Sequence, residues 1–200
     1  MRRHAAVSLL LGVLVLTAGM VGCNDSDEVL SGGNSQVRVM LTDAPADQIA
    51  SAKVTISRVY LVRDDGAPVD LRPASDTPLT FELLDLRNGL TALLADHAVP
   101  AAHYNQLRLV VDSAEVTLVD GLTFSDGTST KTLTVPSGMQ TGIKVQLAEP
   151  ITADEGELTI VTVDFDVADN FVLQGPADAP NGVIFTPVLK EKGRTETAIP

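Results

Sequence analysis

The sequence predicts a mainly β protein: a single antiparallel β-sandwich domain of about eight or nine strands, immunoglobulin-like or transthyretin-like, with one or two short helical turns. From Gln36 onward, apolar residues such as Val37, Val39 and Leu41 recur at every second position, which is the period of a half-buried strand. Clusters of Asp, Gly, Asn and Pro separate such runs and are typical of tight turns. The helical patterns are too short to cross between parallel strands, which favours antiparallel pairing.

The expected elements follow one another along the chain with short connections. A helical turn is expected at 46–50, where Asp43 can cap it and Pro45 stands near its first position, and another at 90–95. Residues 174–181 contain two prolines and predict a long loop before the last strand. The expected strands cover 36–41, 54–61, 79–86, 104–111, 115–119, 131–135, 142–147, 158–167 and 183–189.

The first residues have the parts of an export signal. Arg2 and Arg3 supply positive charge, and the apolar stretch over 5–18 that follows is shorter than the roughly 20 residues of a membrane-spanning helix. Met20-Val21-Gly22-Cys23 then resembles the lipobox of bacterial lipoproteins, although leucine is more usual than methionine at its first position. We therefore expect residues 1–22 to be a lipoprotein signal peptide and Cys23 to carry lipid.

This reading divides the rest of the chain into three parts. Residues 23–35 form the lipidated cysteine and a flexible tether, 36–190 form the β-sandwich domain, and 191–200 form a C-terminal tail. Cys23 is the only cysteine, so no disulfide can stabilise the domain. Acyl chains contribute about 0.8 kcal/mol per buried methylene, and two or more hold a protein at a membrane. The expected location is the cell envelope, and Asn24 after the cysteine favours the outer membrane.

The charge of the chain limits its partners. The formal net charge is −12, and removal of Arg2 and Arg3 with the signal leaves 12 basic and 26 acidic residues, or −14. Such a surface repels nucleic acid and anionic lipid headgroups. We expect no nucleic acid partner, and the membrane to be contacted through the acyl anchor alone.

The segment 164–170 is the strongest candidate site in the sequence. Asp164 and Asp166 are two residues apart and would share one face of a strand, and Asp169 follows as the strand ends. Carboxylates that converge from a strand end and a loop are the ligands that calcium prefers, and Asp43 or Asp85 could add another. The alternative is that these acids cap loops and accept backbone N–H bonds. The spacing does not match an EF-hand loop.

Catalytic patterns are sparse. His97 and His103 have no zinc-ligand spacing with another His or Cys, and Ser137 does not stand in a nucleophile elbow. The glycine-containing stretch 136–142 predicts a hairpin loop rather than a phosphate loop, because Lys144 falls in an alternating strand pattern. We expect the protein not to be an enzyme, and no cofactor apart from the calcium hypothesis.

Exposed aromatic side chains would indicate a sugar-stacking surface. The chain has no Trp, and most aromatic residues fall within strand patterns where they belong to the core. Phe124 and Phe171 lie near expected loops and are the two aromatic residues for which exposure is expected. A flat stacking platform for sugars is therefore not expected.

Several segments together resemble the family catalogued as domain of unknown function 4382, which occurs in bacterial and archaeal envelope proteins, often lipoproteins. The resemblance spans about Ser35 to Lys190, and Ala102 departs from the glycine usual at that position. It implies a compact β-rich domain and no established activity. The segments are Leu41–Pro45, Leu84–Gly89, Val99–Leu109, Val135–Lys144, Val163–Asp166 and Thr186–Lys190.

These observations predict a membrane-anchored envelope lipoprotein whose domain binds or scaffolds an unknown envelope protein or glycan without catalysis. The alternative is a calcium-dependent glycan-binding or adhesion module that uses Asp164, Asp166 and Asp169. A hydrolase is the third reading.

Overall fold

The computed structural model describes residues 35–43, 46–135 and 141–199, which belong to one compact unit, Gly32–Pro200. The predicted signal peptide, Cys23 and the tether up to residue 34 lie outside the described residues, as do residues 136–140 of the predicted hairpin loop. In the described part of the chain, no helix is long and apolar enough to cross a membrane.

Eleven strands form one sheet and two more form a separate hairpin. The sheet contains β1 (Ser35–Thr42), β2 (Ile49–Arg63), β3 (Pro68–Arg72), β4 (Leu79–Glu82), β5 (Ala92–Val99), β6 (Ala102–Leu118), β7 (Thr130–Thr134), β8 (Ile143–Gln146), β9 (Ile151–Ala153), β10 (Glu157–Asp164) and β13 (Leu189–Ala198). The hairpin contains β11 (Phe171–Gln174) and β12 (Gly182–Phe185).

The mainly β class is confirmed, but the two-sheet sandwich is not: the sheet is nearly closed and barrel-like. Eight of its strands follow the order β3-β2-β6-β8-β13-β10-β1-β5, while β4 pairs with β2, and β7 and β9 pair with β6. The two outer strands of this path, β3 and β5, contact each other without a ladder between them. The physical reason is the length of β2 and β6, which pair along most of their length with several register shifts. Bulged strands bend and twist, so this long pair carries the sheet around the core instead of ending in one layer.

The expectation of purely antiparallel pairing is also wrong. β1 pairs with β10 in parallel over seven residue pairs, from Gln36↔Leu158 to Thr42↔Asp164, and β8 pairs with β13 in parallel. Two parallel strands need a long connection between them, and this connection is usually a helix. Here the remainder of the domain provides that connection.

Several elements differ from the predicted ones. Residues 104–111 and 115–119 belong to one strand, β6, while β3, β9 and β11 were not predicted. The expected helical turn at 90–95 falls largely in strand β5, and most of the expected tail at 191–200 is strand β13. The short helical turns are instead η1 (Leu83–Leu86), which falls within an expected strand, and α2 (Val167–Asn170), which begins at the last residue of another.

The core fills the inside of this curved sheet. In β1, Val37, Val39 and Leu41 are fully buried and alternate with partly exposed residues, as the pattern predicted. Three rings continue the core beneath the hairpin: Phe171 and Phe185 stack with centroids 4.7 Å apart, and Phe165 lies 6.1 Å from Phe185. This aromatic cluster fixes the two-stranded hairpin to the large sheet.

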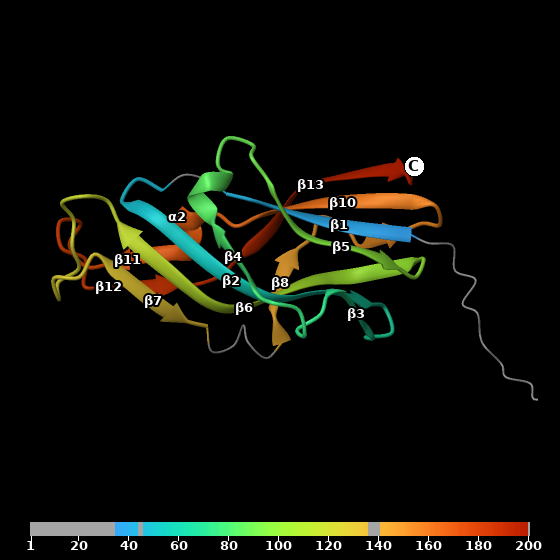
Figure 1. Ribbon diagram of the computed structural model, residues 1–200, viewed down its shortest axis with the longest axis horizontal. Helices are drawn as coiled ribbons and strands as arrows, with labels where there is room; N and C mark the ends of the chain where they lie inside the picture. Colours follow the sequence, from blue (N-terminus) through green and yellow to red (C-terminus); the bar gives the residue numbers. More distant parts are fainter. Residues whose placement is uncertain (1–34, 44–45, 136–140, 200) are drawn as a thin grey trace, which may run out of the picture. The chain divides into compact units, whose positions relative to one another are not determined.

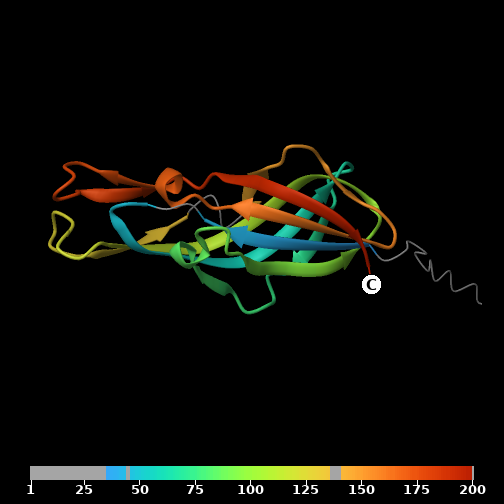
Figure 2. The same ribbon diagram turned by 90° about the horizontal axis from the view of Figure 1, so that it is seen from above.

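The strand directions define two ends of the domain. β1 begins at the right-hand end of Figure 1, where β13 ends and β5 turns into β6. The β11–β12 hairpin and the loop between β6 and β7 lie at the left-hand end, and Figure 2 shows the same separation from above. We call these the Ser35 end and the hairpin end.

Candidate functional site

The three predicted calcium ligands lie close together in the chain but do not converge on one point. Asp164 ends β10, and its Oδ2 lies 3.6 Å from Lys192 Nζ on β13. Its Oδ1 is buried with no hydrogen-bond partner among the described atoms. Asp169 Oδ2 lies 3.2 Å from Lys190 Nζ, also on β13. Two of the three carboxylates are thus paired with lysines.

Asp166 is the N-cap of α2, where its Oδ1 accepts the backbone N–H of Asp169 at 3.2 Å. A cap of this kind satisfies a backbone donor that the first turn of a helix leaves unpaired. Asp43 is brought to the same helix: it is buried after β1, and its Oδ1 accepts the N–H of Val167 at 2.9 Å. The two carboxylates thus accept two backbone N–H groups of the first turn of α2, those of Val167 and Asp169.

Over residues 35–43, 46–135 and 141–199, no group of three or more His, Cys, Asp or Glu side chains could hold a metal ion. Asp85 stands in η1, a different helical turn. The contact of Asp166 is of the kind that the capping alternative describes, whereas the ion pairs of Asp164 and Asp169 belong to neither reading. Calcium binding stays a prediction.

Of the two histidines of the domain, His103 contacts a threonine hydroxyl. His103 Nδ1 lies 3.1 Å from Thr152 Oγ1, on the neighbouring strand β9. The hollow beside His103 is lined by Arg63, Asp64, Asp65 and Ala102, and this lining contains no serine or cysteine. His97 lies on β5 and lines a different hollow. Among the described residues, which do not include Ser137, neither hollow has a serine in its lining.

Phe124 and Phe171, which the sequence suggested as exposed, are buried: their exposed fractions are 1% and 2%. Phe124 is enclosed by the β6–β7 loop, and Phe171 belongs to the aromatic cluster. The exposed large apolar residues of the described chain are aliphatic: Leu90, Leu93, Val172 and Ile184. Sequence reasoning missed them, although their place in short apolar runs next to loops could have indicated them.

Val172 and Ile184 face each other across the β11–β12 hairpin, with exposed fractions of 42% and 50%. Asn170 anchors this hairpin from below. Its side-chain amide donates to the carbonyls of Asp166 and Val188, at 2.6 and 3.2 Å, and its side-chain oxygen accepts the N–H of Val188. A fully buried asparagine with all these bonds made holds the hairpin at a fixed position on the sheet.

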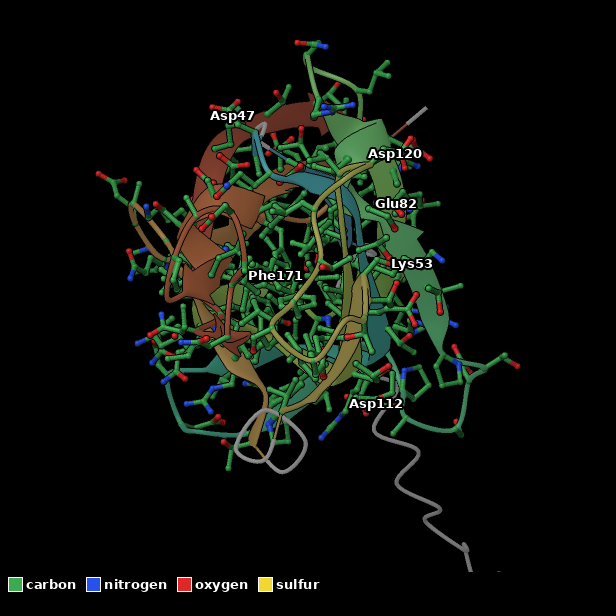
Figure 3. All side chains as sticks on the ribbon, turned by 90° about the vertical axis from the view of Figure 1, so that its left-hand side faces the viewer. Asp47, Lys53, Glu82, Asp112, Asp120 and Phe171 are labelled. Carbon is green, nitrogen blue, oxygen red and sulfur yellow. The ribbon has the colours of Figure 1, made fainter. Side chains whose placement is uncertain are left out.

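A groove of about 280 Å³ runs between β11 and the segment that leads into β2. Most of its lining is apolar, and Asp47 is the one charged residue in it. Figure 3 views the molecule from the hairpin end and shows Asp47 at the rim and Phe171 inside the barrel. We call this the hairpin groove. It is lined by Ala46, Asp47, Gln48, Ile49, Ala168, Phe171, Val172 and Leu173.

Two further hollows lie elsewhere on the sheet. One of about 520 Å³ borders β8 and the loop after it, which Arg194 holds by donating to the carbonyls of Glu149 and Pro150. Another of about 440 Å³ lies at the seam between β3 and β5, with Leu71 and Leu94 in its lining. Neither is flanked by an outward-facing apolar pair like Val172 and Ile184.

Comparison with known proteins gives one match. A family model described as a domain of unknown function (DUF4382) matches residues 34–187. No curated protein and no solved structure matches the chain.

Proposed function

We propose that this chain, which belongs to the DUF4382 family, is a non-enzymatic binding or scaffolding domain held in the cell envelope by lipid on Cys23. The observation that carries the proposal is the arrangement of the domain's two ends. The chain enters at Ser35, while the hairpin groove and the exposed apolar pair lie at the hairpin end. A domain anchored through its N-terminus can then present the groove away from the attachment point.

The length and composition of the tether support this arrangement. Residues 24–34 are polar and include Ser31, Gly32 and Gly33. A flexible chain of this length has a root-mean-square reach of about 18 Å, so the domain can stand off the membrane surface. The acidic charge of the domain also disfavours contact with anionic headgroups. Asn24 supports placement in the outer membrane.

The non-enzymatic part of the proposal is supported by the surroundings of His103. This side chain contacts the Thr152 hydroxyl, and its hollow lacks a serine or cysteine nucleophile. A catalytic triad also requires a third group, usually a carboxylate, that orients the base. Among the hydrogen bonds of the described residues, His103 bonds to the Thr152 hydroxyl and to no carboxylate. Binding of a partner needs a complementary surface and no set of catalytic side chains.

Metabolic labelling with a palmitate analogue tests the anchor. Cells that express the full chain are expected to incorporate label and to carry the protein in the membrane fraction. A Cys23→Ser variant is expected to lose the label and to leave that fraction, because one acidic domain without acyl chains has no other anchor in the described part. Equal labelling of the two proteins would refute the lipid anchor.

A further inference from the structure

We propose that the outer edge of β11 takes an extended, basic and apolar peptide segment of a partner protein as a third strand, seated in the hairpin groove. This inference deepens the proposed function by naming the chemistry of the partner. It follows from three features of the groove: an unpaired backbone edge, exposed aliphatic side chains, and negative charge.

The backbone edge follows from the hydrogen-bond pattern of the hairpin. Among the described residues, β11 forms a ladder with β12 alone. The N–H of Thr186 donates to the carbonyl of Asn170 at 2.9 Å. Because bonded pairs alternate along an antiparallel ladder, the next bonded pair is Val172 with Ile184. Leu173 therefore directs its backbone N–H and C=O to the other side, where the groove lies. Phe171 directs its C=O there too, while its N–H donates to the carbonyl of Val167 as the C-cap of α2.

An unpaired strand edge beside a groove is the arrangement to which extended peptides add in β-augmentation. Backbone bonds supply the affinity in that mode, and alternate side chains supply the specificity. Val172 and Ile184 offer apolar contact on the outward face of the enlarged sheet. Added backbone bonds and added apolar contact thus coincide at β11.

The charge around the groove selects the partner. Asp47 lines it, whereas Asp169, next to Ala168 of the lining, is already paired with Lys190 and adds little net charge. Gln48, also in the lining, donates from Nε2 to the carbonyl of Ala177 at 3.1 Å, which brings the exposed Asp178 beside it. No lysine or arginine lines the groove. Lysine or arginine in the partner would therefore be attracted and acidic residues repelled.

The same charge argues against other occupants. A second copy would place one acidic hairpin end against another. The tether of the chain itself carries Asp25, Asp27 and Glu28 and no basic residue, so it would be repelled as well. The occupant of the hairpin groove is therefore a basic and apolar segment of another protein.

The test uses the full chain in detergent micelles and a fluorescent peptide of about six residues that alternates Lys and Val. Fluorescence polarisation is expected to show saturable binding. A Glu-Val peptide, and a Lys-Val peptide N-methylated at alternate residues, are expected to bind at least about tenfold more weakly. Bound Lys-Val peptide is expected to slow hydrogen exchange at Leu173, because the outward N–H of this residue becomes paired.

Two variants separate the groove from general surface charge. Asp47→Lys is expected to weaken Lys-Val binding by about fivefold, which is the scale of a surface charge contact. Asp154→Lys makes the same charge change in the exposed loop before β10, at the Ser35 end, and is expected to leave binding unchanged. Leu173→Pro removes an outward N–H and is expected to abolish binding with β12 still paired.

The proposal is overturned if the Lys-Val peptide does not bind, if Asp154→Lys weakens binding as much as Asp47→Lys, or if Leu173 gains no protection. If Leu173→Pro does not fold, the comparison of Asp47→Lys with Asp154→Lys and the hydrogen-exchange measurement still show whether the peptide binds at β11. None of these readouts depends on lipid, so their failure is distinguishable from a failure of the Cys23 labelling.

Discussion

At the scale of single residues, the carboxylate of Asp166 acts on the backbone of α2. Asp166→Ala is expected to lower the free energy of unfolding by about 1 kcal/mol, the usual loss for a helix cap. Because the cap needs no metal, the loss is expected to be equal in EDTA and in calcium. Thermal melts of both proteins in both buffers measure it. A rise in wild-type melting temperature with calcium, lost in Asp166→Ala, would restore the calcium hypothesis.

Tyr104 illustrates a second role for a buried polar group. Its hydroxyl donates to the Pro100 carbonyl at 2.7 Å, and burial raises its pKa above the ordinary value of 10.0, while Arg63 nearby opposes the shift. The unfolded tyrosine therefore ionises first as pH rises, so the stability from this group is complete below pH 10.0 and is lost as pH rises through the folded pKa.

Tyr104→Phe is expected to cost about 1 kcal/mol at neutral pH through the lost hydrogen bond. It is also expected to make the loss of stability above pH 10.0 less steep. Urea unfolding at neutral and alkaline pH checks both effects. Tyr60→Phe, which removes another bond from a tyrosine hydroxyl to a carbonyl, is the matched control. An unchanged alkaline slope in Tyr104→Phe would contradict the assignment.

At the scale of elements, β13 is part of the barrel rather than a tail. It pairs with β10 from Lys190 to Ala198 and touches β8 at its start, so it joins two parts of the sheet. Arg194 also pairs with Glu191 at 3.0 Å, and both side chains are largely buried. Removal of this strand would open the sheet between β8 and β10 and leave the edge of β10 unpaired.

A chain that ends at Lys190 is therefore expected to lose its cooperative thermal transition. A chain that ends at Ala198 is expected to melt like the full protein, since β13 stops there. Circular dichroism during heating distinguishes the two. A cooperative melt near the wild-type temperature in the shorter chain would mean that residues 191–198 contribute little, as a frayed tail would.

The elements that could be predicted are those in which one face is buried. β1 was located because its buried residues alternate with exposed ones. β5 was missed because Ala92 to Ala95 are good helix formers, and pairing with β1 overrides that propensity. β13 is rich in charged residues and is held by two neighbouring strands, so no apolar pattern indicates it.

Prediction of the candidate site from the sequence was limited for the same reason, because its residues come from distant parts of the chain. The sequence placed Asp164, Asp166 and Asp169 together, but the lysines that pair with Asp164 and Asp169 come from β13. Lys192 was assigned to the tail, and Lys190 to the last residue of the domain. The hairpin groove combines residues near position 47 with residues near 171, and only the tertiary fold brings them together. Parallel pairing of β1 with β10 likewise depends on long-range register that composition does not encode.

At the scale of the whole molecule, a domain without disulfides is stabilised by the core of a nearly closed sheet. Among the described residues, several strands pair on one side alone, including β3, β4, β5, β7 and both strands of the hairpin. The edge of β11 differs from the edges of β3, β4, β5 and β7 because β11 lines the hairpin groove. The proposed lipid anchor thus precedes Ser35, and the proposed binding edge of β11 lies at the hairpin end.

The most direct test of that claim is site-specific photocrosslinking in intact cells that express the full chain. A photoreactive side chain in place of Val172 is expected to crosslink a discrete envelope protein, and the same group in place of Asp154 is expected not to. The crosslink at 172 is expected to disappear in the Cys23→Ser background, since the domain then leaves the membrane. Crosslinks of equal yield from both positions, or a yield at 172 independent of Cys23, would contradict the account.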